Sequence, residues 1–280
     1  MTLLCIWATL FLAGCDVKDP IYNTPHPDKG AIVITADWTR RGEGIAAPAE
    51  YITEAAGTSF TLHEPVAALT GLFVPGPTEL LGYNPAAHVT VKDGIATVDN
   101  DPDNAGMQHP EPGVLLAGTT VADVVADDTT SVVLPMRQLF RKIESEVVVT
   151  EGDPRRITGI EARLLGVAAS IDLRTGEVTG VAAIVPFPFV RLEGKLVGAV
   201  WVPGIIPGTA QRMAMTLTFS DGRTETVETD LSEMLKDFNA DKLHPMRLTG
   251  DVYAPVNLET GGTIIGWTET DGGDVNAGVE

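Results

Sequence analysis

The sequence predicts an all-β protein of two domains, with many short strands and one short helix in its second half. Its 280 residues correspond to about two domains of ordinary size. Its 29 glycines and 19 prolines interrupt the backbone often, which disfavours a helical bundle and favours short strands joined by turns. Several segments alternate apolar and polar residues, as strands with one buried face do.

The chain opens with an apolar run that ends in Leu12, Ala13, Gly14 and Cys15. The run is too short for a membrane-spanning helix, which needs about 20 residues, and it fits the apolar region of a secretory signal. Its last four residues resemble the bacterial lipobox, where small residues admit a signal peptidase before a cysteine that then carries lipid. We predict a signal peptide over residues 1–14, recognised at Leu12, Ala13 and Gly14, and lipid attachment at Cys15. The alternatives are an ordinary cleaved signal or a buried N-terminal strand, and the basic residues that usually open a signal do not precede Cys15.

Cys5 and Cys15 are the only cysteines of the sequence. The mature chain would therefore keep one cysteine and form no internal disulfide, which excludes thiol redox chemistry and cysteine-bound metals. Residues 15–29 contain three prolines, and we predict that they form an extended tether between the lipid and the first domain.

Residues 30–136 are predicted to form the N-terminal domain. Residues 31–38 are rich in β-branched side chains and lie between Gly30 and a polar loop at 39–44, which predicts a first strand followed by an exposed loop. Asp93-Gly94 interrupts an alternating segment at 88–98 and predicts a hairpin with a type I′ turn. Further strands are expected at 51–54, 59–62, 78–81, 114–117, 121–126 and 131–134, and a loop at 99–112.

Residues 137–280 are predicted to form the C-terminal domain. Apolar and charged residues alternate from 139 to 149, and Asp221-Gly222 predicts a hairpin between 213–219 and 224–229. Further strands are expected at 157–164, 170–173 and 263–268, with a turn at 174–176 and an acidic tail at 271–280. The predicted helix places Leu231, Met234, Leu235 and Phe238 on one face, with Asp230 as N-cap and Glu233 completing a capping box.

The charge of the chain excludes nucleic acid as a partner. Nineteen basic against 38 acidic residues leave a formal net charge of -19. A phosphate backbone or an anionic lipid surface would be repelled. The acidic surface fits solubility outside the cytosol and identifies no partner by itself.

No catalytic or metal-binding pattern is present, so we predict that the protein is not an enzyme and holds no cofactor or metal. The five histidines are scattered without the spacing of metal ligands. Residues 99–103 look like the start of a calcium loop, but Asn104 replaces the required glycine and Pro110 the bidentate glutamate. Nucleophile-elbow, phosphate-loop and zinc-protease motifs do not occur in the sequence.

Several segments together resemble the fimbrillin-like lipoproteins of the Bacteroidales, and among them the FimB-type fimbrial anchor family. The likeness runs from residue 15 to about residue 269, and the order and spacing of the segments carry more weight than any one of them. The segments are HPDKG (26–30) leading into ITADW (34–38), VLPMRQL (133–139), ITGIEARL (157–164) with GVA (166–168), and LTFSDG (217–222) followed by LSEMLKDFN (231–239).

The resemblance implies two transthyretin-like β-sandwich domains in tandem and transport as a lipoprotein to the outer membrane. It also implies a role as anchor or minor subunit of a fimbria, joined to other fimbrial subunits by β-strand exchange. Pairing of this kind adds a strand to a sheet through main-chain hydrogen bonds and needs no catalytic residue.

In stalk members of this group, an arginine-specific protease removes the first strand and opens a groove for a neighbour's strand. Arg40 and Arg41 follow the predicted first strand, where such a cut would fall. An anchor cut there would lose its lipid, so the anchor and stalk roles make opposite demands on this loop. The alternative is a solvated loop that happens to contain two arginines.

The second hypothesis is a lipid-anchored surface protein that binds glycans of a host or bacterial surface. Sugar-binding platforms need exposed aromatic side chains. The sequence has four tryptophans, Trp7, Trp38, Trp201 and Trp267, of which Trp7 lies in the leader and Trp38 and Trp201 lie in strand-like runs expected to be core. A cluster of exposed aromatics would distinguish this hypothesis from the fimbrial one.

Overall fold

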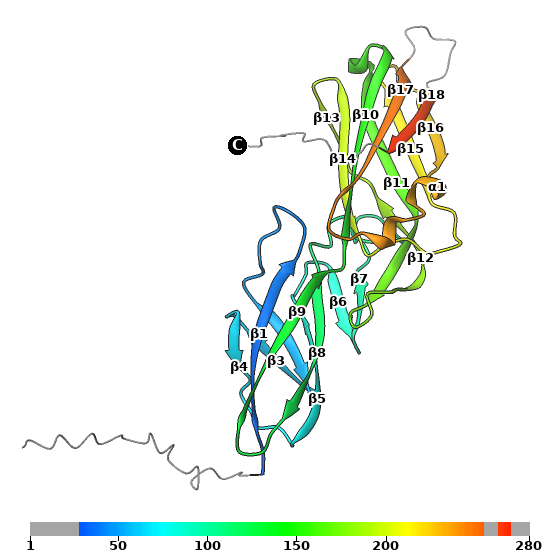
Figure 1. The fold of residues 1–280 in the computed structure, drawn as a ribbon. Helices are drawn as coiled ribbons and strands as arrows, with labels where there is room; N and C mark the ends of the chain where they lie inside the picture. Colours follow the sequence, from blue (N-terminus) through cyan, green and yellow to red (C-terminus); the bar gives the residue numbers. More distant parts are fainter. Residues whose placement is uncertain (1–27, 255–262, 270–280) are drawn as a thin grey trace, which may run out of the picture.

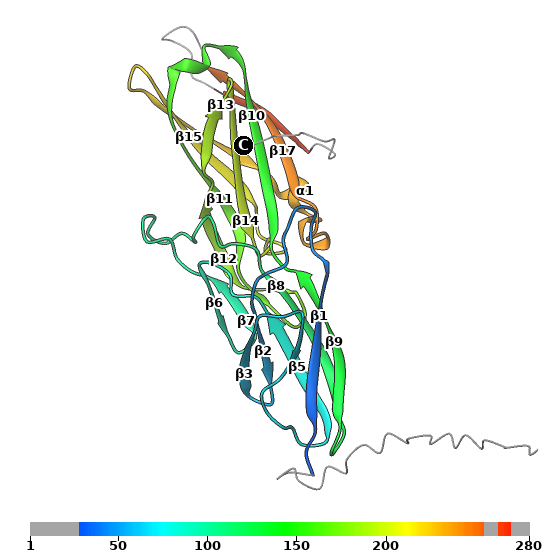
Figure 2. The same cartoon turned by 90° about the vertical axis from the view of Figure 1, so that its left-hand side faces the viewer.

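The computed structural model describes residues 28–254 and 263–269, and within them the chain forms 18 strands, two 3-10 turns and one short α-helix. The predicted signal peptide, Cys15, all but the end of the tether, and the acidic tail lie outside these residues. The two halves of the chain follow one another along an elongated molecule, and β1 begins at one pole (Figures 1 and 2). None of the described helices is long and apolar enough to cross a membrane.

The first half is a β-sandwich made from one folded sheet. Its strand order is β3-β2-β5-β8-β9-β1-β4. The strands are β1 (Ala31–Arg40), β2 (Tyr51–Ala55), β3 (Thr58–Leu62), β4 (Val66–Ala68), β5 (Gly76–Tyr83), β8 (Leu116–Val124) and β9 (Thr129–Gln138). β8 and β9 pair near one end, at Leu116 with Gln138 and Ala117 with Arg137. The sheet folds there into two layers that enclose a buried apolar cluster.

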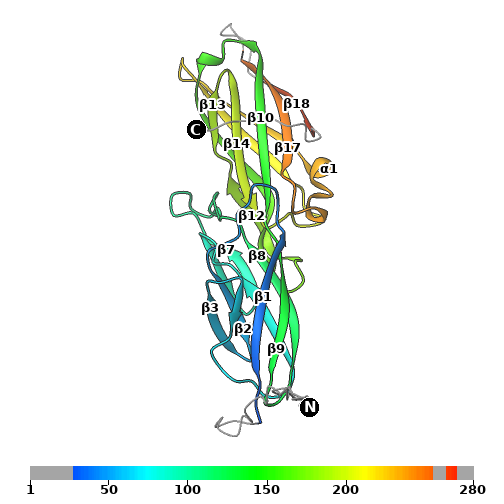
Figure 3. The same ribbon diagram turned by 60° about the vertical axis from the view of Figure 1, so that its left-hand side comes forward.

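Two separate sheets face each other in the second half. One has the order β13-β14-β10-β17-β18, and Figure 3 shows these strands side by side. Its strands are β10 (Arg141–Gly152), β13 (Phe189–Leu192), β14 (Lys195–Val202), β17 (Met246–Ala254) and β18 (Thr263–Glu269). The other sheet contains β11 (Ile157–Asp172), β12 (Val178–Pro186), β15 (Arg212–Phe219) and β16 (Thr224–Asp230). The all-β sandwich prediction is confirmed.

The two halves repeat one topology. The layers β3-β2-β5-β8 and β9-β1-β4 of the first half correspond, strand by strand and in chain order, to β12-β11-β15-β16 and β17-β10-β14 of the second. The first strand of each half pairs in parallel with a later one, β1 with β9 and β10 with β17. β13 and β18 are additions of the second half at the two ends of its five-stranded sheet.

The predicted hairpin around Asp93-Gly94 forms, but it joins the second half. It consists of β6 (Val89–Lys92) and β7 (Ile95–Val98), and both turn residues have positive φ. β7 pairs with the end of β11, at Thr97 with Ser170, so one sheet crosses the predicted domain division at residues 136 and 137. Between the two sheets of the second half lies a second apolar cluster. A third, the junction cluster, includes Leu81, Phe140 and Ile171 and fills the junction between the halves.

Several sequence predictions need correction. β11 is one strand of 16 residues rather than two, since its break at Gly166 is a bulge with φ of 83°. The strands expected at 114–117 and 121–126 are likewise one strand, β8. Five strands were not predicted: β4, β12, β13, β14 and β17. The helix is also shorter than predicted.

That helix, α1, spans Ser232–Leu235, and a 3-10 turn at Phe238–Ala240 follows it. Leu231, not Asp230, occupies the N-cap position. The Asp230 carboxylate instead accepts a hydrogen bond from the Ser232 amide at 2.8 Å. Glu233 contacts Lys236 at 3.5 Å rather than completing a capping box. On the predicted apolar face, Leu231, Leu235 and Phe238 are nevertheless buried, and Met234 is partly buried.

Candidate functional site

The first strand lies where a neighbouring subunit could replace it. β1 pairs in parallel with β9 over most of its length and antiparallel with the three-residue β4. Every second side chain points into the sandwich, so Ile32, Ile34 and Trp38 are buried. A single strand between β9 and β4 therefore supplies one whole row of the core. Its removal would leave an apolar groove with free main-chain groups on both sides.

The outward side chains of the same layer are almost uncharged. Thr35 lies between Val133 on β9 and Val66 on β4, and both valines are exposed. The first charged side chain along β1 is Asp37, which lies on this face near the end of the strand. In a chain with a net charge of -19, such a face suits contact with another protein.

Arg40 and Arg41 lie at the end of β1, but the structure treats them differently. Arg40 is exposed, whereas Arg41 is half-buried. The Arg41 guanidinium donates to the carbonyl oxygens of Trp38 and of Ile45, the latter at 2.7 Å. The predicted exposed loop is therefore wrong for Arg41, because its side chain folds back onto the loop's own backbone.

Gly42 fixes this loop to the rest of the molecule. Its amide donates to the Gln138 side-chain oxygen at 2.9 Å, and a Cβ here would lie 2.4 Å from the carbonyl oxygen of Leu243. The loop thus touches both β9 and the segment before β17. The bond after Arg41 therefore lies in a folded turn in which Gly42 is buried, while Glu43 and Gly44 are exposed.

A polar network at the junction holds the two halves together. The Gln138 amide group donates to the carbonyl oxygens of Phe140, at 2.8 Å, and of Lys242. Arg141 donates to the carbonyl oxygens of His244 at 2.7 Å and Phe238 at 3.0 Å.

Lys242 belongs to the same network. Its ammonium donates to the carbonyl oxygen of Pro203 at 2.7 Å. Burial, and then the charge of Arg141, lower the pKa of Lys242 to about 8. The sequence contained no local signal for this network, because its partners lie about one hundred residues apart.

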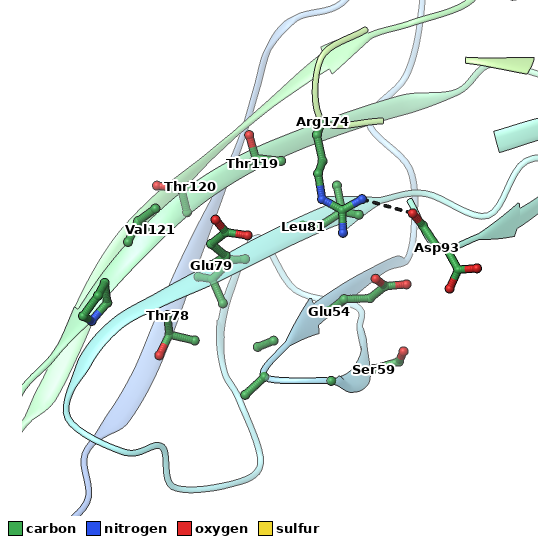
Figure 4. A pocket seen from close by; sticks show the side chains of 15 residues that line it. Glu54, Ser59, Thr78, Glu79, Leu81, Asp93, Thr119, Thr120, Val121 and Arg174 are labelled. Carbon is green, nitrogen blue, oxygen red and sulfur yellow. Dashed lines mark hydrogen bonds between the residues drawn. The ribbon is translucent and has the colours of Figure 1, made fainter. Parts of the chain in front are cut away.

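A groove with a volume of about 960 Å³ lies on the outer face of β2, β5 and β8 (Figure 4). The turns that carry Asp93 and Arg174 flank it, and the Arg174 guanidinium donates to the Asp93 carbonyl oxygen at 3.2 Å. Its polar lining residues are Glu54, Ser59, Thr78, Glu79, Asp93, Thr119, Thr120 and Arg174.

Tyr83 donates to the Glu54 carboxylate of this groove at 3.2 Å. Burial, followed by the Glu54 charge, raises the pKa of Tyr83 to about 12, so the phenol keeps its proton. The groove can form hydrogen bonds with a polar ligand, but no aromatic ring lines it.

The described residues include no group of three side chains that could hold a metal ion. His88 and His109 do come together, with ring centroids 3.4 Å apart, although their spacing in the sequence gave no sign of it. His109 accepts a hydrogen bond from the Glu111 amide at 3.1 Å.

The Asp101 carboxylate accepts hydrogen bonds from the Asp103 amide and from the Asn104 side chain. This arrangement fits a closed turn and not a calcium loop.

The described tryptophans form no exposed platform. Trp38 and Trp267 are buried, and the half-buried Trp201 packs against the junction cluster. The core position expected for Trp38 is thus confirmed, whereas Trp201 is only partly buried. Leu12, Ala13, Gly14 and Cys15 lie outside the described residues, so lipid attachment stays a prediction.

Solved structures of bacterial surface proteins share this fold. No family model matches the sequence, and no curated protein matches it. A candidate adhesin of Bacteroides ovatus aligns with a TM-score of 0.62 and 9% identity, covering 87% of this chain and 93% of that one. The fimbrial anchor protein Mfa2 of Porphyromonas gingivalis aligns with a TM-score of 0.54 and 11% identity, covering 86% of this chain and 97% of that one. A candidate polysaccharide-binding protein of Bacteroides thetaiotaomicron aligns with a TM-score of 0.53 and 8% identity, covering 87% of this chain and 98% of that one. At these identities the likeness establishes a common fold.

Proposed function

We propose that this chain is a structural subunit of a bacterial fimbria, either the anchor or a minor component, held at the outer membrane by lipid on Cys15. The observation that carries the proposal is the position of β1, one replaceable strand between β9 and β4. The fold shared with a fimbrial anchor protein over most of both chains supports it. In this role the chain joins other fimbrial subunits by strand exchange and needs no catalytic group.

Two strands are candidates for the exchange. β1 could leave its place and be replaced by a neighbour's strand. β18 is paired with β17 at the end of its sheet and has no counterpart in the first half, so it could be donated without emptying the repeated core. Main-chain pairing would provide the affinity. The alternating pockets left by Ile32 and Ile34 would fix the register of the incoming strand.

The Arg40-Arg41 loop favours the anchor role. A protease must bind several residues in an extended, accessible form, which folded turns resist. Arg41 and Gly42 are tied to Trp38, Ile45 and Gln138. The loop therefore supports a subunit that keeps β1 and the lipid tether.

The proposal is tested on protein purified from the cell surface. An anchor should carry lipid on Cys15 as its first residue, copurify with other fimbrial subunits, and release fimbriae into the medium when its gene is deleted. Cys15→Ala should move the protein out of the membrane fraction. A mature chain starting at Arg41 or Gly42 would instead assign it to the stalk or tip. A monomer that never copurifies with fimbrial subunits would contradict the proposal.

The groove on the outer face of β2, β5 and β8 makes glycan binding a second candidate function. Its hydroxyl, carboxylate and guanidinium groups can bond sugar hydroxyls, but the aromatic platform expected for such a protein is lacking among the described residues. Polysaccharide binding that is lost in Glu79→Gln and kept in Glu225→Gln, a change on β16, would support this function.

A further inference from the structure

Exposed aliphatic side chains gather at the end of the molecule where β1 begins. Val74 is 72% exposed, Val125 54% and Leu72 44%. Leu72 and Val74 belong to the connection between β4 and β5, and Val125 to the turn between β8 and β9. Figures 1 and 2 show both connections beside the start of β1.

Backbone hydrogen bonds fix these segments to one another. Gly30 and Phe73 exchange two such bonds, at 3.0 and 2.8 Å. The Ala31 amide donates to Asp128 and the Asp127 amide to Lys29, both at 2.9 Å. We call residues 29–31, 69–75 and 124–129 the β1 pole. Its buried Phe73 holds the loop while the side chains on either side of it point outward.

We infer that the β1 pole rests on a zwitterionic lipid surface, with Leu72, Val74 and Val125 in contact with the boundary between headgroups and acyl chains. The inference rests on the proposed lipid attachment at Cys15. The 15 residues from Cys15 to Gly30 span at most about 50 Å when fully extended. The β1 pole is therefore the part of the folded chain that the tether brings closest to the bilayer.

Because of the tether, a weak contact is sufficient to keep the β1 pole on the membrane surface. Three aliphatic side chains would not hold a free protein on a membrane, but a covalently linked lipid keeps the pole at a high local concentration next to the surface. The contact would then orient the molecule, with the second half directed away from the bilayer.

Charge selects the kind of lipid. Asp127 and Asp128 lie in the turn that carries Val125, and Asp123 lies at the end of β8. Lys29 is the one basic residue of the β1 pole. This acidic rim would be repelled by anionic headgroups, so a zwitterionic surface is the one that the pole fits.

The test uses lipidated full-length protein on phosphatidylcholine vesicles with brominated acyl chains, which quench tryptophan on contact. Val74→Trp places a reporter on the β1 pole. Val181→Trp is the matched control, because Val181 is 76% exposed but lies on β12 in the second half. Val125→Trp is a second reporter in case one variant misfolds, and wild type gives the background of the native tryptophans.

Flotation with the vesicles is measured first and quenching second. We expect all variants to float, quenching at position 74 several-fold above that at position 181, and weaker quenching when phosphatidylglycerol is added. Flotation with equal quenching of V74W, V125W and V181W would overturn the inference and leave the lipid anchor standing. Failure to float would overturn both, because the proposed lipid attachment would then be absent.

Discussion

At the scale of single residues, Gly42 determines how well the arginine pair is protected. A side chain at this position would meet the backbone of Leu243, so Gly42→Ala must push the loop outward and loosen Arg41. We expect an arginine-specific protease to cut after Arg40 or Arg41 at least ten-fold faster in Gly42→Ala than in wild type, as measured by N-terminal sequencing of timed digests. Gly71→Ala is the control, because a Cβ there meets nothing within 4 Å. Equal cutting rates in wild type and Gly42→Ala would show that the loop does not protect this bond.

Lys242 should make stability depend on pH in the alkaline range. Its pKa is lowered to about 8 in the folded chain, below the unfolded value of about 10.4. The charged form is therefore penalised in the folded state below about pH 8, and the penalty disappears as the pH rises toward 10.4. Relative to Lys242→Met, wild type should gain roughly 1 to 3 kcal/mol between pH 7.5 and pH 10.

Urea unfolding at the two pH values measures this difference. Lys236→Met, a change at an exposed lysine of the same segment, is the control and should show no comparable gain. A difference between wild type and Lys242→Met that stays constant with pH would contradict the assignment.

At the scale of elements, the sequence predicted the tight turns, whose own residues determine their conformation. The turns at Asp93-Gly94 and Asp221-Gly222 formed where predicted because the signal for a tight turn lies in the turn itself. β4 was missed because its three residues carry no period and are strand only through pairing with β1. β11 was predicted as two strands, at 157–164 and 170–173, whereas pairing with β12 and β15 continues the strand through the bulge at Gly166.

The short helix should depend on its apolar face rather than on its cap. Leu235 is fully buried in the core of the second half, so Leu235→Ala should cost about 2–5 kcal/mol. Asp230 is exposed and its carboxylate interacts with Ser232 and with the charge of Arg212 at the surface, so Asp230→Ala should lower stability far less. Asp230→Asn, which keeps the acceptor, should match wild type. Urea unfolding of the three variants tests this order, and an Asp230→Ala loss as large as that of Leu235→Ala would reverse it.

At the scale of the whole molecule, the sequence indicated the class of fold but not how its parts meet. The pairing of Thr97 with Ser170 and the contact of Gln138 with Lys242 join residues 73 and 104 positions apart, and no pattern within either segment encodes them. The groove combines three strands of the first half with a turn of the second. Such sites depend on topology, so sequence reasoning reached Arg40, Arg41 and the first strand but not the groove or the junction.

The junction cluster should make the two halves unfold as one unit. Phe140 is fully buried there, between strands of both halves, whereas Phe187 is equally buried inside the second half alone. Either change to alanine removes a ring from a packed core and should cost about 3–5 kcal/mol. Calorimetry of wild type should show one cooperative transition. Phe187→Ala should lower its temperature without dividing it, while Phe140→Ala should divide it in two, because it removes the packing by which one half stabilises the other. Two transitions already present in wild type would mean that the halves fold independently and that the junction only positions them.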